Sequence, residues 1–138
     1  MRLRPLAFSL LVLSGLARAD VDLTDDHGTA VHLTQPARRI VSLAPHVTEL
    51  LYAAGAGDRV VGAVQYSDYP EAAKKVARVG SYTAVDMEKV VALKPDLVVA
   101  WKSGNRDAHL DKLRGLGIPV FINEPRKIDD VARSVAQL

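Results

Sequence analysis

The chain has 138 residues, no cysteine and a formal net charge of +2. The lack of cysteine excludes a disulfide scaffold, a thiolate metal site and a cysteine nucleophile, so stability must come from a hydrophobic core. Three of the 18 basic residues lie in the first nineteen positions, which leaves 15 bases against 16 acids in the remainder. This near-neutral balance gives no reason to expect a nucleic acid or an anionic membrane as a partner.

The first nineteen residues have the pattern of a secretory signal peptide. Arg2 and Arg4 precede an apolar stretch over residues 6–13, and Ala17 and Ala19 form a small-residue cleavage signal. The apolar stretch is shorter than the about 20 residues that a membrane-spanning helix needs, which disfavours the alternative of a retained anchor. We therefore expect residues 1–19 to be removed on export and residues 20–138 to form one compact domain.

Strand and helix patterns alternate along this domain. A hairpin is predicted over residues 21–33, around an Asp-His-Gly turn. Short, continuously apolar and β-branched runs predict four buried strands, at 38–43, 59–64, 96–101 and 119–123. Helical patterns are present at 47–54, 70–75, within 85–96, at 106–117 and at 127–138. In the last helix, apolar residues recur at helical spacing on one face: Ile128, Val131, Ala132 and Val135.

This alternation predicts an α/β fold, a three-layer sandwich with a mainly parallel central sheet, because strands that are apolar along their whole length need cover on both faces. Ligands of such sheets bind at the carboxyl ends of the strands. The polar and aromatic residues that follow the predicted strands should therefore share one edge: Pro45, His46, residues 66–69, Trp101, Asn123 and Glu124.

The aromatic residues are the clearest candidates for ligand contact at this edge. The chain has one tryptophan and four tyrosines, and both Trp101 and Tyr66 follow predicted strands. Such side chains combine a broad apolar surface with a polar group, which suits the binding of a wide ligand. Either ring could instead cap the core. Tyr69 is expected to pack beside Pro70 and Tyr52 to lie in the core.

Catalysis and metal binding have weaker support. No two of the four histidines have the i, i+4 spacing of a helical metal site. The residues that could be combined into a hydrolytic site have no spacing that sets a nucleophile beside a base: Ser42, His46, Ser67 and Asp68. We therefore predict a protein that is not an enzyme, with no catalytic residue, no metal site and no cofactor.

Two further side chains have two possible roles each. His46 follows a predicted strand, so it is either a first-turn residue of the next helix or a ligand contact. Glu88 takes the second position of a predicted short helix, where the exposed N–H groups favour an acid, and this structural role would suffice for it.

Several blocks of the sequence occur together in one known family. The motifs "RIVSLAP", "TELL" and "ALKPDLV" are shared widely in the superfamily, whereas "YSDYP" and "AWKSGN" are narrower. Residues 21–138 closely resemble the cobalamin branch of the helical-backbone substrate-binding proteins of bacterial ABC importers. This resemblance implies a two-lobed protein that holds its ligand between the lobes. The chain matches the N-terminal lobe and stops at Leu138, which we interpret as a fragment or a truncated reading frame.

The resemblance also implies roles for particular residues. Tyr66 matches a tyrosine that contacts cobalamin, Tyr82 stands where relatives carry an aromatic residue, and Trp101 matches a tryptophan of the cleft. Pro45 and His46 lie at the exit of the first strand of the parallel sheet, near the same cleft. These five residues form the expected ligand-binding set.

The same resemblance implies that Glu88 is a surface glutamate that docks on arginines of the membrane permease. The expected function is capture of cobalamin or a related corrinoid in the periplasm, without chemistry, and delivery to the ABC permease by a monomer that binds no nucleic acid. One alternative is a carrier of haem, with Tyr66 or His46 as the axial ligand, or of a ferric siderophore. Another is an exported module that binds no ligand.

Overall fold

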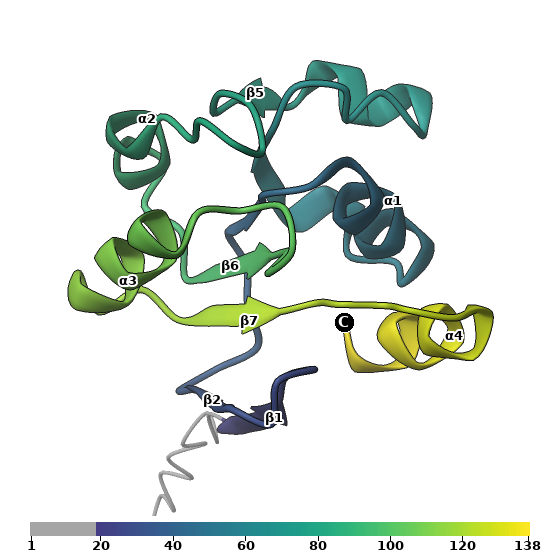
Figure 1. The fold of residues 1–138 in the computed structure, drawn as a ribbon. Helices are drawn as coiled ribbons and strands as arrows, with labels where there is room; N and C mark the ends of the chain where they lie inside the picture. The colour runs from purple at the N-terminus through teal and green to yellow at the C-terminus, as the bar shows by residue number, and fades with distance from the viewer. Residues whose placement is uncertain (1–18) are drawn as a thin grey trace, which may run out of the picture.

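The structure is a computed structural model that describes residues 19–138, and its centre is a five-stranded parallel sheet (Figure 1). The strand order is β5-β4-β3-β6-β7. The bounds are β3 (Ile40–Ser42), β4 (Val60–Ala63), β5 (Ala77–Arg78), β6 (Leu97–Ala100) and β7 (Val120–Ile122). A separate antiparallel hairpin pairs β1 (Val21–Thr24) with β2 (Ala30–Leu33), as predicted.

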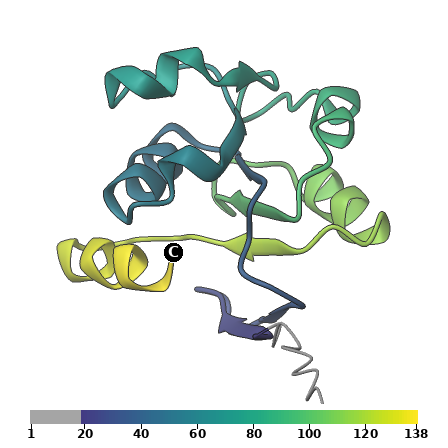
Figure 2. The ribbon, with the colours of Figure 1, turned by 180° about the vertical axis from the view of Figure 1, so that it is seen from behind.

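Helices lie on both sides of this sheet, so the predicted three-layer α/β fold is confirmed. The bounds are α1 (Pro45–Ala53), α2 (Met87–Ala92), α3 (Asp107–Gly115) and α4 (Ile128–Gln137), with the short 3-10 helices η1 (Gly57–Arg59) and η2 (Glu71–Lys75). Figures 1 and 2 show α1 and α4 on one side of the sheet and α2 and α3 on the other.

The strands are apolar along their whole length because their side chains alternate between two buried faces. Successive side chains of a strand point to opposite faces. In β6, Val98 packs in the core on the side of α2 and α3, whereas Leu97 and Val99 pack in the core on the side of α1. In β7, Phe121 is fully buried on the α1 side and its two neighbours face the other core. Both faces are thus buried, which is typical of parallel sheets.

A buried aspartate in the turn of the hairpin joins this turn to the last strand of the sheet by a hydrogen bond. Asp25 Oδ1 accepts hydrogen bonds from the backbone N–H groups of His27 at 2.9 Å and Thr29 at 2.8 Å. Its Oδ2 accepts a third from the backbone N–H of Ile122 in β7, at 3.3 Å. Asp25 is only 4% exposed, so these bonds are shielded from water.

The last helix does not bury its apolar face. Ile128 is 88% and Val131 43% exposed, whereas Asp130 and Ser134 are buried. Ser134 Oγ accepts a hydrogen bond from Asn123 Nδ2 at 2.7 Å. Polar contacts therefore hold α4 on the domain, and its apolar residues remain available to line a surface hollow.

Within residues 19–138, no helix is long and apolar enough to cross a membrane. Residues 1–18 of the expected signal peptide lie outside the described part of the chain.

Replacing Asp25 by alanine should lower the free energy of unfolding by about 2 kcal/mol, because buried N–H groups would lose their acceptor. Urea unfolding followed by the fluorescence of the single tryptophan measures this change. Asp22→Ala is the matched control, since Asp22 is an exposed aspartate of the same hairpin and its partner among residues 19–138 is the exposed His32. Equal unfolding curves for native protein and Asp25→Ala would contradict the anchoring role.

Candidate functional site

The loops at the carboxyl ends of β3 and β6 meet beside α1 and α4. Between them lies a hollow of about 530 Å³ with a mainly apolar lining. Its lining residues come from both helices and from the loops that follow β4, β6 and β7: His46, Glu49, Leu50, Ala53, Tyr69, Trp101, Pro125, Val131 and Val135. Two of the five predicted ligand-binding residues, His46 and Trp101, are among them.

Trp101 is the centre of a small cluster of rings at this hollow. Its ring centroid lies 5.2 Å from that of His46, with the two planes nearly perpendicular at 88°. The ring of Tyr82 lies 5.9 Å away and is tilted by 52°. Edge-on and tilted arrangements are the favoured ones for such pairs. A third predicted residue, Tyr82, therefore joins the site by contact with Trp101.

The position of the indole depends on Gly104 in the turn after β6. A Cβ atom at Gly104 would overlap the six-membered part of the Trp101 ring. The absence of a side chain at this one position lets the indole lie flat over the turn, which explains the use of glycine in "KSGN".

His46 is uncharged at neutral pH. Burial lowers the pKa of its imidazole, and the negative charge of Glu124 opposes this shift only in part. Its Nε2 atom is buried without a hydrogen-bond partner among the described residues. His46 stands in the first turn of α1 and also lines the hollow, so the two alternatives from the sequence are compatible.

Glu124, at the exit of β7, is a charged group near this cluster. Burial acts to raise the pKa of its carboxyl, but hydrogen bonds from the hydroxyl and backbone N–H of Ser103, together with the nearby charges of Arg126 and His27, bring the pKa below its usual value. The backbone of Glu124 is held in turn by Asp26 Oδ2, which accepts its N–H at 2.6 Å.

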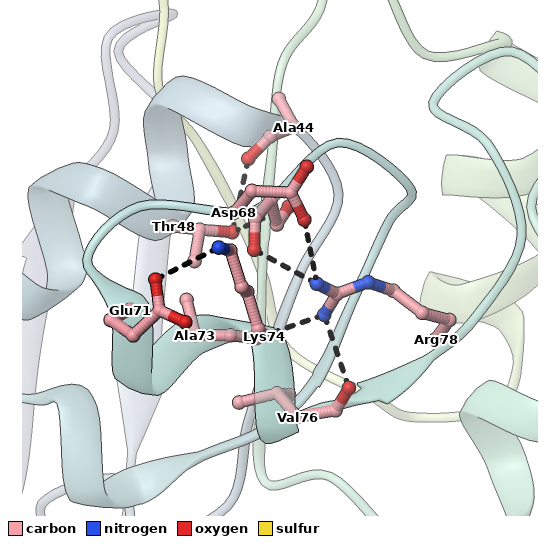
Figure 3. A network of polar contacts seen from close by, with 9 residues as sticks. Ala44, Thr48, Asp68, Glu71, Ala73, Lys74, Val76 and Arg78 are labelled. Atoms are coloured by element: carbon pink, nitrogen blue, oxygen red, sulfur yellow. Dashed lines mark hydrogen bonds and ion pairs between the residues drawn. The ribbon is translucent and has the colours of Figure 1, made fainter.

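Tyr66 lies on an exposed loop and outside the lining of the hollow. Its φ angle of 66° is in the left-handed region, which is uncommon for a non-glycine residue, and its side chain is 76% exposed. The next residue anchors the loop, because Ser67 Oγ accepts from Thr48 Oγ1 at 3.0 Å and Ser67 O accepts from Arg78 at 2.9 Å. Figure 3 shows that the guanidinium of Arg78 also reaches Asp68 and the carbonyl of Val76. The backbone that carries the exposed ring is therefore fixed from two sides.

Tyr69 has a position at the hollow that was not predicted. Its side chain, which was expected to pack beside Pro70, is 69% exposed and lines the hollow. The apolar residues of α4 were also not predicted as part of the site, although their spacing was visible in the sequence. Val131 and Val135 line the hollow because the opposite face of α4 is held by polar contacts.

The remaining predicted residues have other positions. Pro45 is the first residue of α1, where its fixed φ suits a helix start, and it does not line the hollow. Glu88 is exposed in the first turn of α2. The side chain of Asp86 caps this helix by accepting the Lys89 N–H at 3.1 Å. In Figure 1, α2 lies on the opposite side of the sheet from α1 and α4.

Residues 19–138 contain no group of three or more metal-ligating side chains close enough to share an ion. An α/β domain with an apolar, aromatic hollow near its strand ends has the features of a ligand-binding domain. Residues 40–138 match the periplasmic binding protein family, and the chain belongs to this family.

Relatives with known names agree with this assignment. The chain is 49% identical over 104 residues to the vitamin B12-binding protein of Yersinia pestis (strain Pestoides F), a match that covers 75% of this chain and 37% of that protein. The crystal structure of the periplasmic vitamin B12-binding protein BtuF of Vibrio cholerae is 45% identical with a TM-score of 0.69, over 72% of this chain and 39% of that one. The periplasmic haem-binding protein RhuT from Roseiflexus sp. RS-1, in its apo form, is 30% identical with a TM-score of 0.64, over 73% and 40%.

Gly104→Ala should displace the indole of Trp101, because the new methyl group would overlap the ring. We expect a changed emission maximum and faster quenching of tryptophan fluorescence by acrylamide. Gly115→Ala is the matched control, since a Cβ there has no atom within 4 Å. Native-like fluorescence of Gly104→Ala would contradict the described packing.

Proposed function

We propose that this protein is the substrate-binding component of an ABC importer that captures cobalamin or a related corrinoid in the periplasm. The observation that carries the proposal is the ring cluster of Trp101, His46 and Tyr82 at an apolar hollow. Its support is the 49% identity to a protein named for vitamin B12 binding. The chain spans 37% of the length of that relative, so the described residues are proposed as a part of the binding site.

The site has the chemistry that a corrinoid needs. A corrinoid is a broad, partly apolar ring with amide groups at its edge. The rings of Trp101 and Tyr82 would offer flat apolar area to its face, and exposed Tyr66 would contact its edge. Capture of this kind requires no nucleophile or general base, which agrees with a hollow lined mainly by apolar side chains.

Haem is the second candidate ligand, and a specific observation favours it. The neutral imidazole of His46 at the hollow has the protonation state that binds iron. The 30% identity to a haem-binding protein adds to this possibility. The corrinoid remains the preferred ligand because the relatives named for vitamin B12 binding are more similar in sequence.

The first test uses Trp101 as an internal probe, since it is the only tryptophan of the chain. Cyanocobalamin should quench its fluorescence in a saturable manner, because the corrin absorbs where indole emits. Haemin is titrated in parallel by its Soret band. Tight haemin binding with a shifted Soret band, and no saturable quenching by cyanocobalamin, would reject the corrinoid in favour of haem.

Variants localise the binding. Tyr66→Ala and Tyr82→Ala should each weaken cyanocobalamin binding by about threefold to tenfold, the contribution of one aromatic contact. Leu116→Ala removes an exposed apolar side chain from the far end of α3 and should leave the affinity unchanged. Unchanged affinity in both tyrosine variants would remove these rings from the proposed site.

We further propose that Glu88 docks on a basic side chain of the membrane permease. Glu88→Ala should leave ligand affinity unchanged, because α2 lies across the sheet from the hollow, but should reduce cobalamin uptake by cells by about fivefold, the upper range for an exposed ion pair. Glu71→Ala, at an exposed acid of η2, is the control. Weakened ligand binding with normal uptake would contradict docking.

A further inference from the structure

One buried amide joins the three segments that carry the ring cluster. Asn105 is 5% exposed, directly after Gly104. Its Oδ1 accepts a hydrogen bond from the backbone N–H of Trp101 at 2.7 Å. Its Nδ2 donates to the backbone carbonyl of Leu43 at 2.8 Å and to that of Tyr82 at 2.8 Å.

These three bonds give a partner to every hydrogen-bonding group of the Asn105 side chain. A carboxamide has one carbonyl and two N–H groups, and here each has a backbone partner. A carboxylate of the same shape could keep the bond from Trp101, but it would face two carbonyl oxygens with no proton to donate. Position 105 therefore requires a side chain that has the size of asparagine and also offers two N–H donors and one acceptor.

The three backbone partners belong to loops that are far apart in the sequence. Leu43 lies three residues before His46, and the other two partners carry the rings of Tyr82 and Trp101 themselves. The bond between Asn105 and Tyr82 spans 23 positions, and the bond to Leu43 spans 62. One amide thus sets the spacing between the backbone segments that hold all three rings.

We infer that Asn105 is a positioning residue of the ligand site, an inference that rests on the proposed function. The amide is buried beneath the loops and would not touch the ligand. It acts through Trp101, Tyr82 and the loop before His46, so its loss should separate rings that must meet one flat ligand together.

The buried Asp25 provides a control for a general loss of stability. Its side chain accepts three hydrogen bonds, from the backbone N–H groups of His27, Thr29 and Ile122, and the residue is 4% exposed. None of these three donors belongs to the segments that carry the rings. Asp25→Ala therefore removes buried hydrogen bonds, as Asn105→Asp does, but outside the ring cluster.

The experiment measures both variants and the native chain in three ways. These are the emission maximum and acrylamide quenching of Trp101 without ligand, the affinity for cyanocobalamin, and unfolding by urea. We expect Asn105→Asp to shift the emission and to weaken binding by about tenfold or more, since two buried carbonyls lose their donors. Asp25→Ala should unfold more easily but keep native emission and affinity under folding conditions.

Acidification adds a readout that simple destabilisation would not give. Protonation of the carboxyl introduced by Asn105→Asp restores one donor, so its emission should return toward that of native protein as the pH falls. The emission of native protein over the same pH range is the reference.

The outcomes separate the inference from the proposed function. If native protein binds cyanocobalamin and Asn105→Asp binds it equally well, or if both variants lose affinity alike, the positioning role is wrong. If native protein fails to bind cyanocobalamin, the proposed function is wrong for this chain. In that case the emission of Trp101 still tests whether Asn105 positions the rings. An unchanged emission in Asn105→Asp would reject the positioning role in addition to the proposed function.

Discussion

Burial of both faces of the central sheet is the constraint on which the rest of this structure depends. The strands alternate their side chains between two apolar cores, so polar and aromatic groups from neighbouring strands can come together only where the strands end. The first turn of α1, which follows β3, and the loops after β5 and β6 supply His46, Tyr82 and Trp101 to one cluster. The position of the hollow therefore follows from the sheet, and the loops decide its chemistry.

The fold was largely predictable because its strands have a simple signature. Apolar, β-branched runs located four of the five parallel strands, but β5 has only two residues and gave no pattern. The start of α1 was placed two residues late, since Pro45 itself begins the helix. For α4, the apolar spacing was correct, but its burial was not predictable. Asp130 caps the start of α4 by accepting the N–H groups of Arg126 and Lys127, which is a local contact. The bond between Asn123 and Ser134 depends on a tertiary arrangement that periodicity does not reveal.

The candidate site was only partly predictable, for a related reason. Strand ends and the resemblance pointed to Trp101, Tyr82 and His46, which the structure brings together. Whether a loop residue turns toward a hollow or into solvent depends on its backbone and its anchors. Tyr66 and Tyr69 share one loop, yet only Tyr69 lines the hollow. The role of Asn105 depends on two carbonyl groups 23 and 62 positions away, which no local pattern could indicate.

The bond between Asp25 and Ile122 has a consequence for the order of folding. It joins residues 97 positions apart, so the turn of the hairpin can form before its partner strand is in place. Until β7 has formed, the side chain of Asp25 lacks one of its three hydrogen bonds, and this bond does not yet fix the hairpin on the sheet. Closing so large a loop is costly in chain entropy and belongs late in folding. The β1–β2 hairpin, although it comes first in the chain, is thus among the last elements to take its final position.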